Sequence, residues 1–208
     1  MLDECVDRSE RTYGPHDAPG FPIFLLWLAL SPVAHADSHD LQRGVGAAAG
    51  IVASIYVHEL GHAAAFELAG AENIRIHIPG PQCKLLCGQT DATWTARPSA
   101  AQMRWTSVAG FVSSNVAAET MLQHDGLARS GFGQGMIASN LYSNAAHVLT
   151  YYTRVRGRNG YRGNDIDSYE LAGGNPHLLS AALLGYSAYA LHRMHRKHIP
   201  VLFVSTHF

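Results

Sequence analysis

The chain has 208 residues and a formal net charge of -1, a balance that gives no reason to expect nucleic acid as a partner. Charged residues make up only 15% of the chain, against roughly 25% in soluble domains. This deficit and the 20 glycines favour helices that pack through small residues in a lipid bilayer. The mean hydropathy of -0.02 argues against many membrane spans.

The N-terminal region contains an apolar run over residues 21–30, followed by Ala34-His35-Ala36, which fits a signal-peptidase site. The run is short for a transmembrane helix. These features predict a signal peptide over residues 1–36 and a single membrane-embedded domain over residues 37–208. The preceding segment is long and acidic for a signal peptide. A start further along the chain, or a buried or membrane-dipping segment, is therefore the alternative.

The stretch 44–70 is mostly apolar or small, lacks proline and ends in glycine, which predicts a long helix. It contains the pentad His58-Glu59-Leu60-Gly61-His62. On a helix, His58 and His62 lie one turn apart on one face, where two imidazoles can bind one zinc ion. Glu59 is then placed to take a proton from a zinc-bound water, as the general base of peptide hydrolysis.

The alternative interpretation of the pentad is a purely structural one, a pair of hydrogen-bonded histidines on a buried helix. Three titratable groups in an apolar helix are costly to bury unless a metal or polar partners compensate. The pattern therefore favours a metal centre.

Residues 73–78 alternate as a strand does and end at Pro79-Gly80-Pro81, and residues 84–94 follow as a possible returning strand. We therefore expect a small β-hairpin after the first helix. Cys83 and Cys87 lie in its connection. They are interpreted as a pair of thiols or a local disulfide, with a second metal site that includes His77 as the alternative.

Further apolar helices are predicted over 103–123, 132–152 and 176–192, the last with Asn175 as its cap and Pro176 at its first position. Asn140, Asn144 and His147 form a polar stripe at helical spacing. We expect this stripe to face inward rather than to be a solvated face. The predicted fold is an all-α membrane bundle of three to four apolar helices, with the hairpin between the first two.

Basic residues in segments 75–104 and 154–162 agree with a cytoplasmic placement of both loops. We therefore expect a multi-pass protein of a bacterial inner membrane. The basic tail 193–198 disagrees with a fourth full span, so the last helix is expected to be re-entrant or interfacial.

The pentad in the first apolar helix, with a strand-like loop and further apolar helices after it, resembles the site-two protease family of intramembrane zinc metalloproteases. The resemblance covers about residues 44–167 and is specific at the pentad. It implies a zinc cofactor and a third ligand from an Asp-Gly motif near the end of a later core helix. Asp165 is the best match, although Ile166 stands where the family has glycine.

A catalytic zinc needs three protein ligands and one open position, whatever the family. The third ligand has to come from outside the pentad helix. Asp165 is the first choice, and Asp167, Glu119 and His147 are the alternatives. Asp165 and Asp167 could instead pair with nearby arginines.

We predict a zinc-dependent intramembrane endopeptidase that hydrolyses peptide bonds of peptide or transmembrane protein substrates. Glu59 is the expected catalytic residue, and the strand 74–78 is placed to pair with an extended substrate segment. One alternative is a soluble exported metallopeptidase of the zincin type. Others are a zinc-binding membrane scaffold without proteolytic activity and a membrane protein with a chance pentad.

Overall fold

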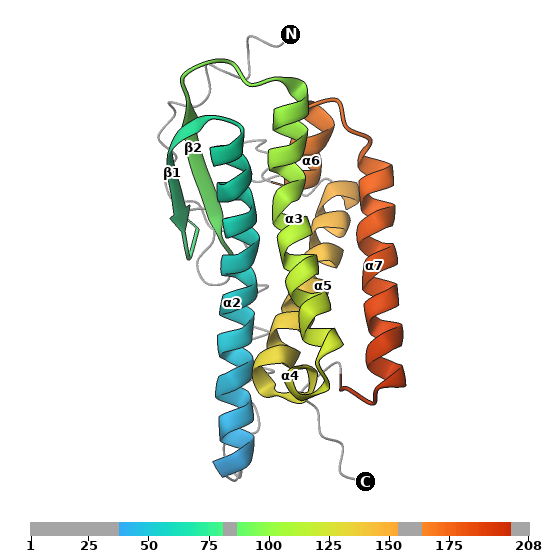
Figure 1. Cartoon of the computed structure of the whole chain (residues 1–208). Coiled ribbons are helices and arrows are strands. Elements are labelled where there is room, and N and C mark those ends of the chain that lie inside the picture. The colour runs from blue at the N-terminus through green and yellow to red at the C-terminus, as the bar shows by residue number, and fades with distance from the viewer. Residues whose placement is uncertain (1–37, 81–86, 154–163, 201–208) are drawn as a thin grey trace.

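A computed structural model describes residues 38–80, 87–153 and 164–200 (Figure 1). This part of the chain is mostly helical, with one small antiparallel sheet. The elements in chain order are α2 (Ser38–Leu68), β1 (Ala71–His77), β2 (Gln89–Trp94), α3 (Ala100–Gln123), α4 (Asp125–Arg129), α5 (Gly131–Thr153), α6 (Asp165–Leu171) and α7 (Pro176–Arg196). The predicted signal peptide and the arginine-rich segment 154–162 lie outside the described residues.

The first long helix forms as expected, but α2 begins at Ser38, six residues before the predicted start at Gly44. Polar residues such as Asp40 and Arg43 fit an exposed first turn, so apolar content alone placed the start too late. The predicted end is confirmed. Gly70 has a φ of 84°, a conformation that glycine adopts without steric cost, and it turns the chain from α2 into β1.

The predicted hairpin also forms. β1 and β2 pair antiparallel from Ala71 opposite Trp94 to His77 opposite Gln89, with a register shift between Glu72 and Arg75. In Figure 1 the two strands lie beside the C-terminal half of α2, which is the half that carries the pentad. The hairpin is thus held next to the candidate site.

The later helices match the prediction and have identifiable caps. Ser99 and Gln102 form a reciprocal capping box at the start of α3. Asn175 caps α7 by accepting from two backbone amides, as the sequence predicted. The short helices α4 and α6 were not predicted, because five and seven residues are too few to show periodicity.

The close contact between α2 and α5 depends on glycine. A Cβ atom at Gly50 would lie 2.8 Å from the backbone nitrogen of Met136, and one at Gly135 would lie 2.8 Å from the backbone carbon of Ala47. The backbones of the two helices therefore touch, as small-residue packing in membranes allows. This contact brings α5 within reach of the pentad face of α2.

Two apolar clusters fill the remaining space between the helices. One joins α3, α4, α5 and α7 around Leu122, Ile137 and Met194. The other, around Phe111 and Ile166, joins α3, α5, α6 and α7 next to the pentad. The second cluster fixes α6 against the bundle.

The polar stripe of α5 faces inward, as predicted. Asn140 and Asn144 are fully buried, and both side-chain amides donate to Oδ1 of Asn115 on α3, at 2.9 and 3.0 Å. Asn144 also donates to Ser187 of α7 at 3.3 Å. Hydrogen bonds thus join α3, α5 and α7, and the stripe is not a solvated face.

Within the described residues, one helix is long and apolar enough to cross a membrane, the stretch Asp40–Leu68 of α2. Only 28% of its most apolar window is buried in the molecule, unlike the core helix of a soluble domain. The other three predicted helices form, but none passes this test, because polar side chains such as Asn115 and Gln134 interrupt them. A multi-pass arrangement is therefore not supported by length and composition.

Candidate metal centre

The pentad lies on the inner face of α2, and its two histidines face each other. His58 and His62 are buried, their ring centroids are 4.8 Å apart, and their Nε2 atoms are separated by 3.1 Å. This is the arrangement that helical spacing predicts for two ligands of one ion.

Asp165 meets the two histidines from α6. Its Oδ2 atom lies 3.1 Å from Nε2 of His58 and 3.3 Å from Nε2 of His62. The neighbouring residue Asn164 fixes this position, since its Oδ1 accepts from the backbone amide of Ile166 at 3.0 Å. Its Nδ2 donates to the carbonyl of His147 at 2.7 Å. One side chain therefore caps α6 and ties it to the end of α5.

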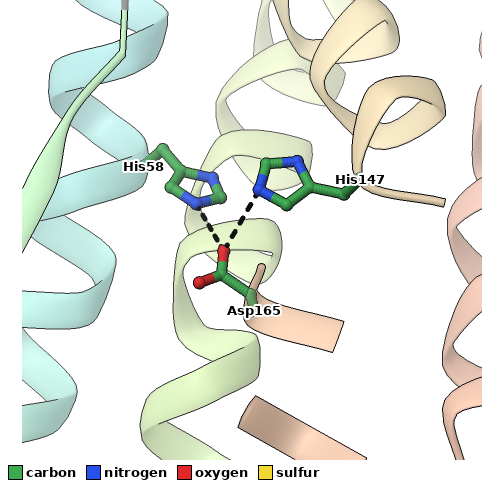
Figure 2. A group of neighbouring side chains, drawn as sticks. All are labelled: His58, His147 and Asp165. Atoms are coloured by element: carbon green, nitrogen blue, oxygen red, sulfur yellow. Dashed lines mark hydrogen bonds and ion pairs between the residues drawn. The ribbon is translucent and has the colours of Figure 1, made fainter. Parts of the chain in front are cut away.

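His147 comes to the same point from α5. Its Nε2 lies 3.5 Å from Oδ2 of Asp165, and its ring stacks on that of His58 with centroids 5.8 Å apart. Figure 2 shows the rings of His58 and His147 directed from opposite sides at the carboxylate of Asp165. The ligand atoms of these three residues lie within 4.8 Å of one another, so the group could hold a metal ion.

Hydrogen bonds of His62 and His147 show which nitrogen of each ring is available, whereas Nδ1 of His58 is buried without a hydrogen-bond partner. Nδ1 of His62 lies 2.7 Å from the carbonyl of Thr106, and Nδ1 of His147 lies 2.8 Å from the carbonyl of Ser143. A carbonyl accepts, so both Nδ1 atoms carry a hydrogen, and Nε2 is the atom that each ring directs at Asp165. Metal-ligating histidines have this arrangement in general.

Asp165 itself is ionised. Burial raises the pKa of its carboxyl, but the neighbouring His62 and His58 outweigh burial and hold the pKa well below its usual range. A carboxylate oxygen and several imidazole nitrogens converge on one point. A cation between them, either a proton on one of the rings or a metal ion, stabilises this arrangement. The donor set therefore fits a metal ion, and its nitrogen and oxygen atoms suit zinc among other divalent metals.

Gly110 of α3 provides the space for such an ion. A Cβ atom at this position would lie 2.5 Å from Nε2 of His58 and closer still to Nε2 of His62. The two ligand atoms thus face bare backbone. Any larger residue at position 110 would fill the space at the point where they converge.

Glu59 is next to the centre and is held by β2. Its carboxylate Oε2 accepts from the hydroxyl of Thr90 at 2.8 Å, and its backbone carbonyl lies 3.1 Å from the same hydroxyl. A Cβ atom at Gly88 would lie 2.5 Å from Oε1 of Glu59, so this side chain packs on the Gly88 backbone. Glu59 is buried, and the hydrogen bond to its carboxylate comes from an uncharged hydroxyl.

Of the other ligand candidates, Glu119 lies away from the centre. Its carboxylate pairs with Arg193 of α7 and accepts from Gln123. Asp167 does not belong to the metal-binding group, although it begins the same short helix as Asp165. Of the four candidates for the third ligand, Asp165 and His147 therefore lie at the centre, whereas Glu119 and Asp167 do not belong to it.

The alternative of a second metal site at the hairpin is wrong. Cys87 is disulfide-bonded, so it has no thiolate to offer. His77 pairs with Asp91 across the hairpin at 3.3 Å. Cys83 lies outside the described residues.

Four features of the site were not expected from sequence: the simultaneous approach of His147 and Asp165, and the contacts of Gly88, Thr90 and Gly110. The stripe at Asn140, Asn144 and His147 indicated which face of α5 turns inward. Nothing in the sequence marked the three other residues, because their contribution is a close approach between separate elements.

Comparisons with known proteins identify no relative. No family model matches the chain, and neither a curated protein nor a solved structure does. The function has therefore to be inferred from the site itself.

Proposed function

We propose that this protein is a zinc-dependent endopeptidase of the membrane, which hydrolyses peptide bonds of membrane-associated substrates. One observation carries the proposal. The fold brings Asp165, more than a hundred residues along the chain, within 3.3 Å of both pentad histidines, while Glu59, next to His58 in the chain, is buried against Thr90 and Gly88. A chance pentad in a structural helix has no reason to collect a carboxylate at this point.

The proposed roles follow from the geometry. Bound zinc would lower the pKa of a water molecule and polarise a scissile carbonyl. His58, His62 and Asp165 hold the ion, with the carbonyl of Thr106 orienting His62. The Glu59 carboxylate takes the proton of the attacking water and passes it to the leaving amine.

The hairpin gives Glu59 its position and is the element nearest to an incoming substrate. Thr90 of β2 bonds the carboxylate of Glu59 directly. An extended peptide that pairs with an edge of this two-stranded sheet would run beside the general base. A helical substrate segment has to unwind to be cut, because a helix uses its own peptide groups in hydrogen bonds.

The apolar surface supports a membrane location over a soluble metallopeptidase. Large apolar side chains are exposed along all four long helices, including Val45, Val52 and Tyr56 on α2, Val112 and Val116 on α3, Leu149 on α5 and Leu184 on α7. In water this much exposed apolar surface would favour aggregation, whereas in lipid it is the expected exterior. Retention in membranes after a carbonate wash tests this point. Release into the soluble fraction would support the exported zincin instead.

The decisive experiment compares the parent with Glu59→Gln. We expect both purified proteins to bind about one equivalent of zinc, since Glu59 is not a ligand. In detergent micelles, the parent should cleave single-span transmembrane peptides, with products identified by mass spectrometry, and the variant should lose at least about a hundredfold in rate. A parent that takes up no zinc, or a variant that cleaves at the parental rate, would contradict the proposal.

A zinc-binding membrane protein without proteolytic activity is the second candidate, and His147 is the observation that favours it. Four protein ligands would fill a tetrahedral zinc, as in structural sites. In that case zinc binds, and peptides are not cut by either the parent or Glu59→Gln. The packing of Glu59 on Gly88 and Thr90 favours the enzyme, because a structural site needs no buried carboxylate beside it.

A further inference from the structure

The centre contains one more nitrogen donor than a catalytic zinc requires. His58, His62 and Asp165 are sufficient for a site with an open position. We propose that His147 is a fourth ligand of the resting centre, and that it is the ligand that leaves when a substrate or substrate analogue binds. This inference rests on the metal centre of the proposed function and adds a closed resting state to it.

The orientation of His147 is that of a ligand. Its Nδ1 hydrogen is used by the carbonyl of Ser143, so Nε2 has a lone pair, and this atom lies 3.5 Å from Oδ2 of Asp165. Figure 2 shows the Nε2 atoms of His58 and His147 on either side of that oxygen. Both groups can bind one metal ion through these atoms, which lie close enough together to share it.

Packing holds the imidazole of His147 at the centre. It stacks on the ring of His58 at an interplanar angle of 26°. It also makes an edge-to-face contact with Phe111, at an interplanar angle of 87° and with centroids 4.9 Å apart. Phe111 also contacts His58, at 5.4 Å between centroids. The three rings therefore form one packed group whose nitrogen atoms face Asp165.

Three differences from the other ligands make His147 the exchangeable one. Its Nε2 is the most distant of the three nitrogens from Oδ2 of Asp165. His62 is anchored to a different helix through Thr106, whereas the ring of His147 is hydrogen-bonded to Ser143 of its own helix. It is also the most exposed of the three histidine side chains, at 26% against 10% and 9%. Its Nδ1 hydrogen bond therefore does not tie the ring to another helix, and only ring packing holds it there.

Exchange of His147 explains how a centre with four protein ligands could still offer Glu59 a metal-bound water. A tetrahedral ion with four protein ligands has no place for the water that Glu59 would deprotonate. Departure of His147 opens that place only when a substrate competes for it. The resting protein would then hold no activated water that could hydrolyse other peptide bonds.

Cobalt substitution in the detergent-solubilised full chain tests the inference, because the visible absorption of Co²⁺ depends on the number and type of its ligands. We expect His147→Ala to bind Co²⁺ at least about tenfold more weakly than the parent. We also expect an altered spectrum, which added imidazole restores by filling the vacated position. Acetohydroxamate, a chelating substrate analogue, should make the spectra of parent and variant alike, since His147 has left in both.

Each other outcome has a defined meaning. Parental affinity and spectrum in His147→Ala would show that His147 is not a ligand, and the proposed function would stand. Spectra that differ even with acetohydroxamate would show that His147 stays bound, which overturns the exchange. A parent that binds neither Co²⁺ nor Zn²⁺ would remove the metal centre and the proposed function together.

Controls separate ligation from general damage. His177→Ala removes a histidine whose Nδ1 bonds the hydroxyl of Tyr152 on the surface, and it should leave metal affinity and spectrum unchanged. If His147→Ala does not fold, as judged by circular dichroism, His147→Gln keeps most of the side-chain volume and serves in the same measurements.

Discussion

Helix α3 meets charged groups at two places, and the comparison between them shows how the candidate metal centre differs from an ordinary cluster of ion pairs. Near its C-terminal end, Glu119 pairs with Arg193, and Lys197 bonds Asp125 at 2.6 Å. Every carboxylate there has a cationic side chain beside it. In the middle of the same helix, Gly110 faces His58 and His62, and the only carboxylate in contact with them is that of Asp165 among the described residues.

The difference lies in charge balance. The C-terminal end of α3 is neutralised by the protein's own residues, and its ion pairs tie α3 and α4 to α7. At the pentad, several ring nitrogens and one carboxylate converge on a single point, and among the described residues no lysine or arginine joins that group. Buried charge without a partner is costly, so this group needs a cation, which can be a proton on one of the imidazoles or a bound metal ion.

The largest effect is expected from a substitution that fills the space between Gly110 and the pentad histidines. In Gly110→Ala the new methyl group would overlap Nε2 of both histidines, so we expect metal binding to be lost or weakened by more than about a hundredfold. Zinc content after dialysis measures this. Gly185→Ala, a substitution in α7 with no atom within 4 Å of the new Cβ, is the matched control and should keep its zinc. Full zinc in Gly110→Ala would mean that the ion, if any, is bound elsewhere.

A smaller and more selective effect is expected from the hairpin. In Gly88→Ala the added methyl group would push the carboxylate of Glu59 away from its position, while the ligands stay in place. We expect about one equivalent of zinc and a loss of cleavage of roughly 10²-fold. Thr90→Val, which removes the hydroxyl but keeps the shape, should lose about tenfold, and Thr90→Ser should recover most of that.

How much of this was predictable from sequence depends on the range of the interaction. The pentad histidines, the Asn175 cap and the stop at Gly70 follow from local spacing and residue type, and the structure has them as expected. Asp165 was singled out by its place after the third apolar helix. The cap by Asn164 and its bond to the carbonyl of His147, which put the carboxylate at the centre, depend on tertiary contact.

What was missed has the same cause. Gly110 and Gly88 matter because two backbones approach the ligands and the base, and a single glycine in a sequence does not show what lies opposite it. The helices α3 and α5 were placed correctly as elements but wrongly expected to have the apolarity of full spans, whereas the last helix, α7, was expected to be re-entrant or interfacial. The asparagines of α3 and α5 form hydrogen bonds between helices. A hydropathy scale counts these side chains as polar, although the structure uses them in helix packing.

The smallest effect on stability or activity is expected at the C-terminal end of α3, where Asp125 is paired with Lys197. Lys197 lowers the pKa of Asp125 in the folded protein through a hydrogen bond and its charge. The folded state therefore binds the proton less readily than the unfolded chain. The stability from this pair is present at neutral pH and is lost as the pH falls through the lowered pKa.

Asp125→Asn should therefore leave zinc binding and cleavage at parental levels and lower Tm slightly at pH 7, with the difference shrinking in acid and in high salt. Thermal unfolding of parent and variant between neutral and acidic pH measures it. The pair is exposed and the carboxylate already has its cation, so nothing at this end depends on an ion from solution. Loss of zinc in Asp125→Asn would break the distinction between the two ends of α3, because it would couple the metal centre to a salt bridge that its geometry does not reach.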